Sequence, residues 1–138
     1  MSDTKTGLEK EIKDLADYLN QIANGMIKSC YACKHKMVDV DTNHCCECNS
    51  IVNIYDMTDF IYSSDIYDME YIAGMSGEYK AVKLWIALGS PTVWIDTVAE
   101  AVKGVCGSDE AYAGLSKKTV KAIDYVAENM YSELRRSA

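Results

Sequence analysis

The chain has 138 residues, of which 49% are hydrophobic and 25% charged, as expected for one globular domain with a single core. Its formal net charge of −7 argues against direct contact with nucleic-acid phosphates. Charged side chains across residues 5–13 argue against a secretory signal, and no apolar run is long enough for a membrane helix, so we expect a cytoplasmic protein with reduced thiols.

Two helical segments are predicted in the N-terminal half. Thr6 and Glu9 have the spacing of a capping box, and apolar residues then recur every three or four positions, which predicts an amphipathic helix over residues 7–24. Gly25 is a typical C-terminal stop for this helix. After a cysteine-rich segment, a second and short helix is predicted within residues 51–62.

From residue 68 the apolar period changes to two, which predicts β-strands. The predicted strands cover residues 69–74, 79–88, 92–97 and, unless a helix begins near residue 99, residues 101–106. Together they form an antiparallel meander of three to four strands. Trp85 and Trp94 fall on neighbouring strands, where they could stack, although packing in the core is the expected role of both.

The chain ends in a second amphipathic helix, for which Ser116 is a suitable N-cap and whose apolar stripe extends to Leu134. Segregated helices and strands define an α+β fold. We therefore predict a single α+β domain over residues 1–138. It consists of an N-terminal helix, a small four-cysteine zinc module at residues 28–50 inserted after that helix, the meander and a C-terminal helix.

Five of the six cysteines and both histidines fall within residues 30–50. Cys30 and Cys33 form one C-x2-C pair, Cys45 and Cys48 form another, and two such turns can direct four thiolates at one tetrahedral zinc ion. Because four thiolates leave no open position for water, we predict one structural Zn²⁺ per chain. Iron in the same site, disulfides and unligated thiols are the alternatives.

The other cysteines and the histidines are predicted to have no catalytic role. Cys46 neighbours a predicted ligand and is expected to be a free thiol, whereas His35 and His44 are reserve ligands. Cys106 is expected to be a small core residue on a strand. Since zinc-bound thiolates are not free to attack a substrate and the sequence has no phosphate-binding glycine loop, we predict that the protein is not an enzyme.

An acidic stretch without Lys or Arg extends from residue 37 to residue 79 and is interleaved with tyrosines. Such a surface steers association with a basic partner, and tyrosine supplies a large and rigid contact area. A merely solvated acidic surface, with tyrosines that cover the core, is the alternative. The candidate partner-binding residues are Asp56, Asp59, Tyr62, Asp65, Tyr67, Asp68, Glu70 and Glu78.

Two segments resemble small uncharacterised proteins of phages from Gram-positive bacteria: GEYKAVKLWIALGSPTVWIDT (residues 77–97) and LSKKTVKAIDYVAENMYSEL (residues 115–134). Combined with Cys30, Cys33, Cys45 and Cys48, the chain resembles a type II-A anti-CRISPR protein that carries a zinc-binding module. The resemblance covers most of the chain loosely, and only the four zinc ligands carry over to numbered positions.

The resemblance implies a phage or mobile-element protein that acts by recognition in the cytoplasm of a bacterial host cell. Its partner would be the type II CRISPR effector nuclease, a protein with a basic nucleic-acid channel, and it would block loading of target DNA. Two other hypotheses stay open. One is a zinc-containing adaptor or transcriptional regulator, and the other is a small metalloenzyme, which would need an open metal position.

Overall fold

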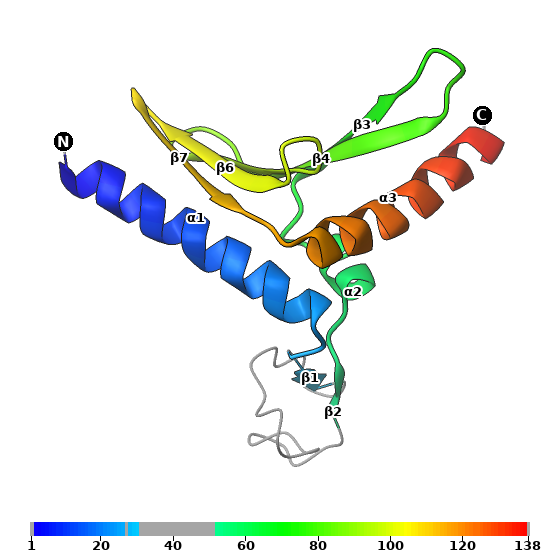
Figure 1. Cartoon of the computed structure of the whole chain (residues 1–138), viewed down its shortest axis with the longest axis horizontal. Coiled ribbons are helices and arrows are strands. Elements are labelled where there is room, and N and C mark those ends of the chain that lie inside the picture. The colour runs from blue at the N-terminus through cyan, green and yellow to red at the C-terminus, as the bar shows by residue number, and fades with distance from the viewer. Residues whose placement is uncertain (1, 27, 31–51, 138) are drawn as a thin grey trace.

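Two long helices lie against one face of an antiparallel β-sheet (Figure 1). The computed structural model describes the backbone of residues 2–26, 28–30 and 52–137, and the side chains of residues 5–26 and 54–137. The α+β class predicted from the sequence is confirmed. The elements in chain order are α1 (Ser2–Ala23), β1 (Lys28–Cys30), β2 (Val52–Ile54), α2 (Met57–Ile61), β3 (Asp68–Ala73), β4 (Tyr79–Ala87), β5 (Thr92–Asp96), β6 (Ala101–Cys106), β7 (Asp109–Gly114) and α3 (Lys117–Ser137).

The first helix is longer than predicted at its start and ends where the sequence indicated. It begins at Ser2, nearly one and a half turns before the predicted start at residue 7, because no proline or glycine in residues 2–6 interrupts the helical backbone. At its end, Gly25 adopts a positive φ of 70°. The Gly25 N–H donates to the Ile22 carbonyl at 3.0 Å and the Met26 N–H to the Gln21 carbonyl at 2.9 Å. This pattern is a Schellman motif, which confirms the predicted stop.

The sheet is a meander of five strands in the order β3-β4-β5-β6-β7, whereas the sequence predicted three to four. The fourth strand, β6, is confirmed, and β7 is the one that was missed. Its residues, Asp109–Gly114, include no large aliphatic side chain and so show no hydrophobic period. β7 forms because Gly107, with a φ of 62°, turns the chain back so that all six residues pair with β6.

Strand pairing arranges side chains in rows that cross all five strands. One row, here called the core row, faces the helices and is entirely apolar: Met69, Leu84, Ile95, Val102 and Ala113. Side chains alternate along a strand, so the residues on either side of each member of the core row point to the opposite face of the sheet. The row on the opposite face, here called the open row, consists of Asp68, Trp85, Trp94, Lys103 and Tyr112.

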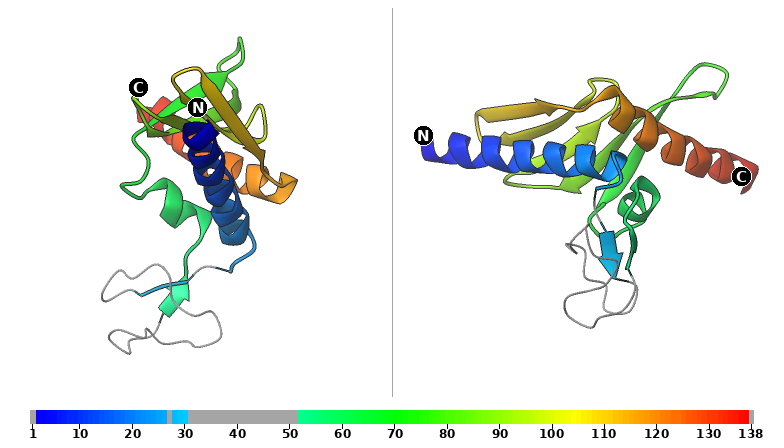
Figure 2. Two further views of the ribbon diagram at one scale, coloured as in Figure 1. Left: turned by 90° about the vertical axis from the view of Figure 1, so that its left-hand side faces the viewer. Right: turned by 60° about the horizontal axis from the view of Figure 1, so that its bottom comes forward.

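Both long helices pack on the face that carries the core row. α1 lies along β6 and β7, and α3 lies along β4 (Figure 2). Ile12 and Leu19 of α1 and Ile123 of α3 are fully buried in this core. Burial of each such aliphatic side chain contributes about 1.5–3 kcal/mol. No described helix or strand covers the other face of the sheet.

Asn20, near the end of α1, links the two long helices. Its side-chain oxygen accepts hydrogen bonds from the Ser116 N–H at 3.1 Å and from the Thr119 hydroxyl at 2.6 Å. The Ser116 hydroxyl oxygen accepts the Thr119 N–H at 3.1 Å, which confirms Ser116 as the N-cap of α3. Since Thr119 is fully buried, water cannot replace these bonds.

Gly104 sets how closely α1 approaches the sheet. A Cβ atom at this position of β6 would lie 2.6 Å from Cδ1 of Ile12 and 3.1 Å from Cδ1 of Leu8. Both side chains are buried, so neither can move aside without disturbing the core. Gly114, on the adjacent strand β7, has no atom within 4 Å of the corresponding position.

We expect the Gly104→Val substitution to lower the free energy of unfolding by about 1–3 kcal/mol, because it overpacks the contact between α1 and β6. The same substitution at Gly114 is the matched control and should leave stability unchanged or slightly raised, since valine favours strands. Chemical denaturation monitored by circular dichroism measures both. Equal stability of the two variants would show that α1 does not sit on Gly104.

Candidate interaction surface

The short helix α2 presents two of the predicted carboxylates on its exposed side. Met57, Phe60 and Ile61 are buried, so the helix is fixed to the core through one face. Asp56 and Asp59 form a reciprocal capping box: the Asp59 N–H donates to Asp56 Oδ1 at 3.0 Å, and the Asp56 N–H donates to Asp59 Oδ2 at 3.0 Å. The helix is shorter than the predicted span of residues 51–62, because β2 occupies its beginning.

The segment that follows α2 carries the two predicted tyrosines, and both are exposed. Tyr62 retains 67% and Tyr67 68% of its accessible surface. By contrast Tyr55 is buried and Tyr71 and Tyr79 are half-buried, so the tyrosines of the acidic stretch divide between surface and core. We call the exposed set the acidic surface; it consists of Asp56, Asp59, Tyr62, Asp65 and Tyr67.

A groove of about 300 Å³ adjoins Tyr62 and separates it from the C-terminal half of α3. Tyr71, Met130 and Leu134 supply most of its apolar lining, and Glu133 adds a carboxylate. Leu134 retains 58% of its accessible surface, although it ends the apolar stripe of α3. The groove therefore offers apolar side chains beside negative charge, a combination that suits an aliphatic stem with a cationic end.

The opposite border of the acidic surface is basic. A second groove, of about 500 Å³, separates Asp56 from the first half of α3, where Lys118, Lys121 and the exposed Tyr125 line it. Neither lysine forms an ion pair with Asp56 or with another described residue. The acidic surface is thus confined to α2 and the segment after it.

The structure separates the other three predicted partner-binding residues from this surface. Asp68 and Glu70 lie on β3, and their pairing with Trp85 and Lys83 places them on the open face of the sheet. Glu78 belongs to the turn between β3 and β4, where its Oε1 accepts the Ser76 N–H at 3.1 Å. The eight candidates therefore occupy three places, which proximity in sequence did not indicate.

The β3–β4 hairpin is held to α3 by contacts that sequence reasoning missed. The Tyr131 hydroxyl donates to the Gly77 carbonyl at 2.8 Å, and Arg135 Nη1 donates to the same oxygen at 2.6 Å. The Tyr79 hydroxyl donates to Asp124 Oδ1 at 2.6 Å. The rings of Tyr71 and Tyr131 lie 5.2 Å apart. The only signal for this cluster in the sequence is the presence of tyrosines in both the β3–β4 hairpin and α3.

Burial raises the pKa of several tyrosines. The pKa of Tyr18, which packs edge-on against Phe60, is raised to about 12, chiefly by burial and then by the charges of Tyr55 and Asp65. Burial also raises the pKa of Tyr79, to which the hydrogen bond with Asp124 adds, and the pKa of Tyr71. In each case the neutral phenol is favoured in the folded state, relative to an unfolded pKa of about 10.

This difference predicts alkaline unfolding. The stabilisation is complete below the unfolded pKa of about 10 and is lost as the pH rises through the folded value of about 12 for Tyr18. The Tyr18→Phe variant should show a shallower loss of stability over this range, because one titrating group is gone. The exposed Tyr62, changed to Phe, is the control and should follow the wild-type profile. Denaturation midpoints across the pH range measure both, and indistinguishable profiles for all three proteins would contradict the assignment.

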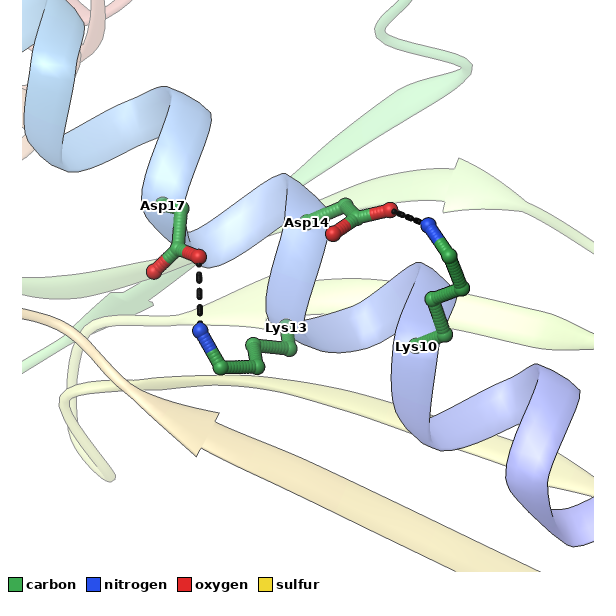
Figure 3. A network of polar contacts seen from close by, with 4 residues as sticks. All are labelled: Lys10, Lys13, Asp14 and Asp17. Carbon is green, nitrogen blue, oxygen red and sulfur yellow. Dashed lines mark hydrogen bonds and ion pairs between the residues drawn. The ribbon is translucent and has the colours of Figure 1, made fainter.

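The helix α1 is also acidic, but two of its carboxylates, Asp14 and Asp17, are paired within the helix. Lys10 Nζ lies 2.7 Å from Asp14 Oδ2, and Lys13 Nζ lies 2.8 Å from Asp17 Oδ2 (Figure 3). Each exposed pair stabilises the helix by only about 0.3–0.5 kcal/mol, but each also neutralises a negative charge locally. Among the described residues neither Asp56 nor Asp59 has such a pair. The two acidic regions therefore differ in the charge that they present to a partner.

The predicted zinc ligands Cys33, Cys45 and Cys48 lie outside the described residues, together with Cys46 and both histidines. The backbone of Cys30 is described: it ends β1 and pairs with Val52 of β2. The described backbone therefore stops at Cys30 and resumes at Val52, and these two residues are paired neighbours on β1 and β2. Four cysteine thiolates are a donor set that fits zinc. Cys106 is half-buried against the core, as predicted.

We expect the purified protein to contain one zinc ion per chain. The Cys→Ser substitution at Cys30, Cys33, Cys45 or Cys48 should lower the zinc content to near zero, because three thiolates do not close a structural site. The same substitution at Cys46 or Cys106 should leave it unchanged. Elemental analysis of each variant gives the count, and loss of metal in the Cys46 variant would assign a different set of ligands.

No known protein family, curated protein or solved structure matches this chain. None of the described helices combines the length and apolar character that crossing a membrane requires.

Proposed function

We propose that this protein is an anti-CRISPR protein that binds the type II CRISPR effector nuclease and blocks loading of target DNA. The observation that carries the proposal is the contrast in charge between the two acidic regions. Asp14 and Asp17 of α1 are neutralised by lysines one turn away, whereas Asp56 and Asp59 are exposed and have no lysine or arginine partner among the described residues.

The acidic surface has the two properties that recognition of a basic protein requires. Carboxylates attract the arginines and lysines of a nucleic-acid channel, which accelerates association. The exposed rings of Tyr62 and Tyr67 supply contact area at low cost in side-chain entropy. Structural zinc, held by the four cysteines, would brace the segment between α1 and α2 and has no chemical step to perform.

The position of α2 supports binding without rearrangement. The helix is held by the buried side chains of Met57, Phe60 and Ile61 and by its capping box. A rigid surface loses little conformational entropy on association, so more of the contact energy appears as affinity.

A DNA-cleavage assay with purified type II nuclease, guide RNA and target tests the proposal. The triple variant Asp56→Asn, Asp59→Asn and Asp65→Asn removes three charges, and asparagine can still cap α2. We expect it to inhibit about tenfold less than wild type at low salt and to depend less on salt concentration. The matched control Glu9→Gln, Glu11→Gln and Asp14→Asn removes three charges from α1 and should inhibit like wild type.

Equal inhibition by the two triple variants would show that only net charge matters and would contradict the assignment of the acidic surface. Unchanged cleavage in the presence of excess wild-type protein would reject the anti-CRISPR function itself. Binding to the nuclease without protection of the DNA would instead support the adaptor hypothesis.

A further inference from the structure

The face of the sheet opposite the helices carries large aromatic side chains over which no described helix or strand lies. Trp85 and Trp94 stack across β4 and β5, with ring centroids 5.3 Å apart and planes inclined by 36°. The cross-strand stacking that the sequence suggested is confirmed, but the expected role in the core is wrong, because neither ring belongs to the core beneath the helices. At the β7 edge, Tyr112 retains 79% of its accessible surface.

The charges on this face argue against a polyanionic ligand. Asp68 and Glu70 lie at its β3 edge, and Glu110 lines a shallow groove with Trp94 and Tyr112 at its β7 side. Phosphates would meet these carboxylates in a chain whose net charge is −7.

The order of residues in the open row is self-complementary. From β3 to β6 the row is Asp68, Trp85, Trp94 and Lys103, so an acid and a base flank a symmetrical pair of tryptophans. A two-fold interface requires such an arrangement, because each residue must meet its counterpart from an identical surface. In the adjacent row Lys83 on β4 lies opposite Asp96 on β5, but Asp96 is buried and its Oδ1 accepts the N–H groups of Val98 and Ala99, so only the open row carries the argument.

We infer that the open face is the interface between two copies of this chain, packed sheet against sheet. A two-fold axis parallel to the strands and midway between β4 and β5 lays β4 of one copy over β5 of the other, and β3 over β6. Trp85 then meets the second copy's Trp94, and Asp68 meets the second copy's Lys103. Every charged contact within the open row therefore joins opposite signs.

The geometry of stacked sheets permits these contacts. Strands are spaced by about 4.8 Å, so β3 and β6 each lie about 7 Å from the axis. Stacked sheets are rotated by about 30°, which displaces the facing residues at that radius by about 4 Å. The extended side chain of Lys103 spans this offset, whereas the central tryptophans are hardly displaced.

The size of the face indicates a reversible dimer. The four strands that overlap, β3–β6, each have about six residues and give a flat area of roughly 19 by 20 Å. Its projected area of roughly 380 Å² is below the 800 Å² or so per partner that is typical of stable complexes. We therefore expect monomer and dimer to exchange with concentration, and we expect the tryptophans, which are half-buried in one chain, to be shielded further in the dimer.

Sedimentation and tryptophan fluorescence of the wild-type protein, in reducing buffer to exclude intermolecular disulfides, test the inference. Trp85 and Trp94 are the only two tryptophans in the chain, so the emission reports on this face alone. We expect the mass to fall from twice 15.4 kDa to 15.4 kDa on dilution, with a red shift of the emission over the same concentrations. A monomer at all concentrations, or a dimer whose dissociation leaves the emission unchanged, would overturn the inference.

A charge swap identifies the contact. Asp68→Lys or Lys103→Glu alone places like charges opposite one another across the two-fold axis and should weaken the dimer about tenfold or more. The double variant restores opposite signs and should recover most of the loss. Glu9→Lys and Lys121→Glu, on exposed parts of α1 and α3, are the matched controls and should dimerise like wild type.

Thermal unfolding checks that each variant is folded, since Lys103 lies 4.0 Å from Asp96 within one chain and its reversal strains that pair. If Lys103→Glu does not fold, Asp68→Lys and the fluorescence of the wild type decide the question. A dimer that Asp68→Lys leaves unchanged would place the interface elsewhere. All these measurements omit the nuclease, so their outcome is independent of the proposed function.

Discussion

Burial of the core row beneath α1 and α3 is the interaction on which the rest of the structure depends. Each large aliphatic side chain in it contributes about 1.5–3 kcal/mol, several times the contribution of an exposed ion pair such as Lys10–Asp14. Once Leu84, Ile95 and Val102 face the helices, the pleat forces Trp85, Trp94 and Lys103 to the opposite side. The open face is therefore a geometric consequence of the core.

The same packing separates the two surfaces to which we assign binding. The acidic surface lies on α2 and the segment after it, on the side of the molecule that carries the helices, whereas the open face lies beyond the sheet (Figure 1). Tyr131 and Arg135 of α3 hold the β3–β4 hairpin against this helix through their hydrogen bonds to the Gly77 carbonyl. Two copies joined through the open face would leave both acidic surfaces accessible, so the proposed dimer is compatible with recognition of a partner.

Local sequence patterns predicted the elements well where a periodic apolar signal was present. The two long helices, the stop at Gly25, the cap at Ser116 and four of the strands follow from such patterns. β7 was missed because its small residues form a strand only through pairing with β6 and contact with α1, neither of which a local sequence pattern indicates. Tyr62 and Tyr67 were predicted as partner-binding residues only because they are interleaved with the carboxylates in the sequence. Both are exposed in the structure.

By itself, the sequence determined the α+β class, the stop of α1 at Gly25, the N-cap of α3 at Ser116 and a grouping of cysteines whose spacing suits zinc, because propensities, caps and ligand spacing act over a few residues. Only the tertiary structure decided that the tryptophans avoid the core. It also decided that Asp68 and Glu70 are separated from Asp56 and Asp59. These outcomes depend on strand register and on which face the helices cover, and both are fixed by contacts between residues far apart in the chain.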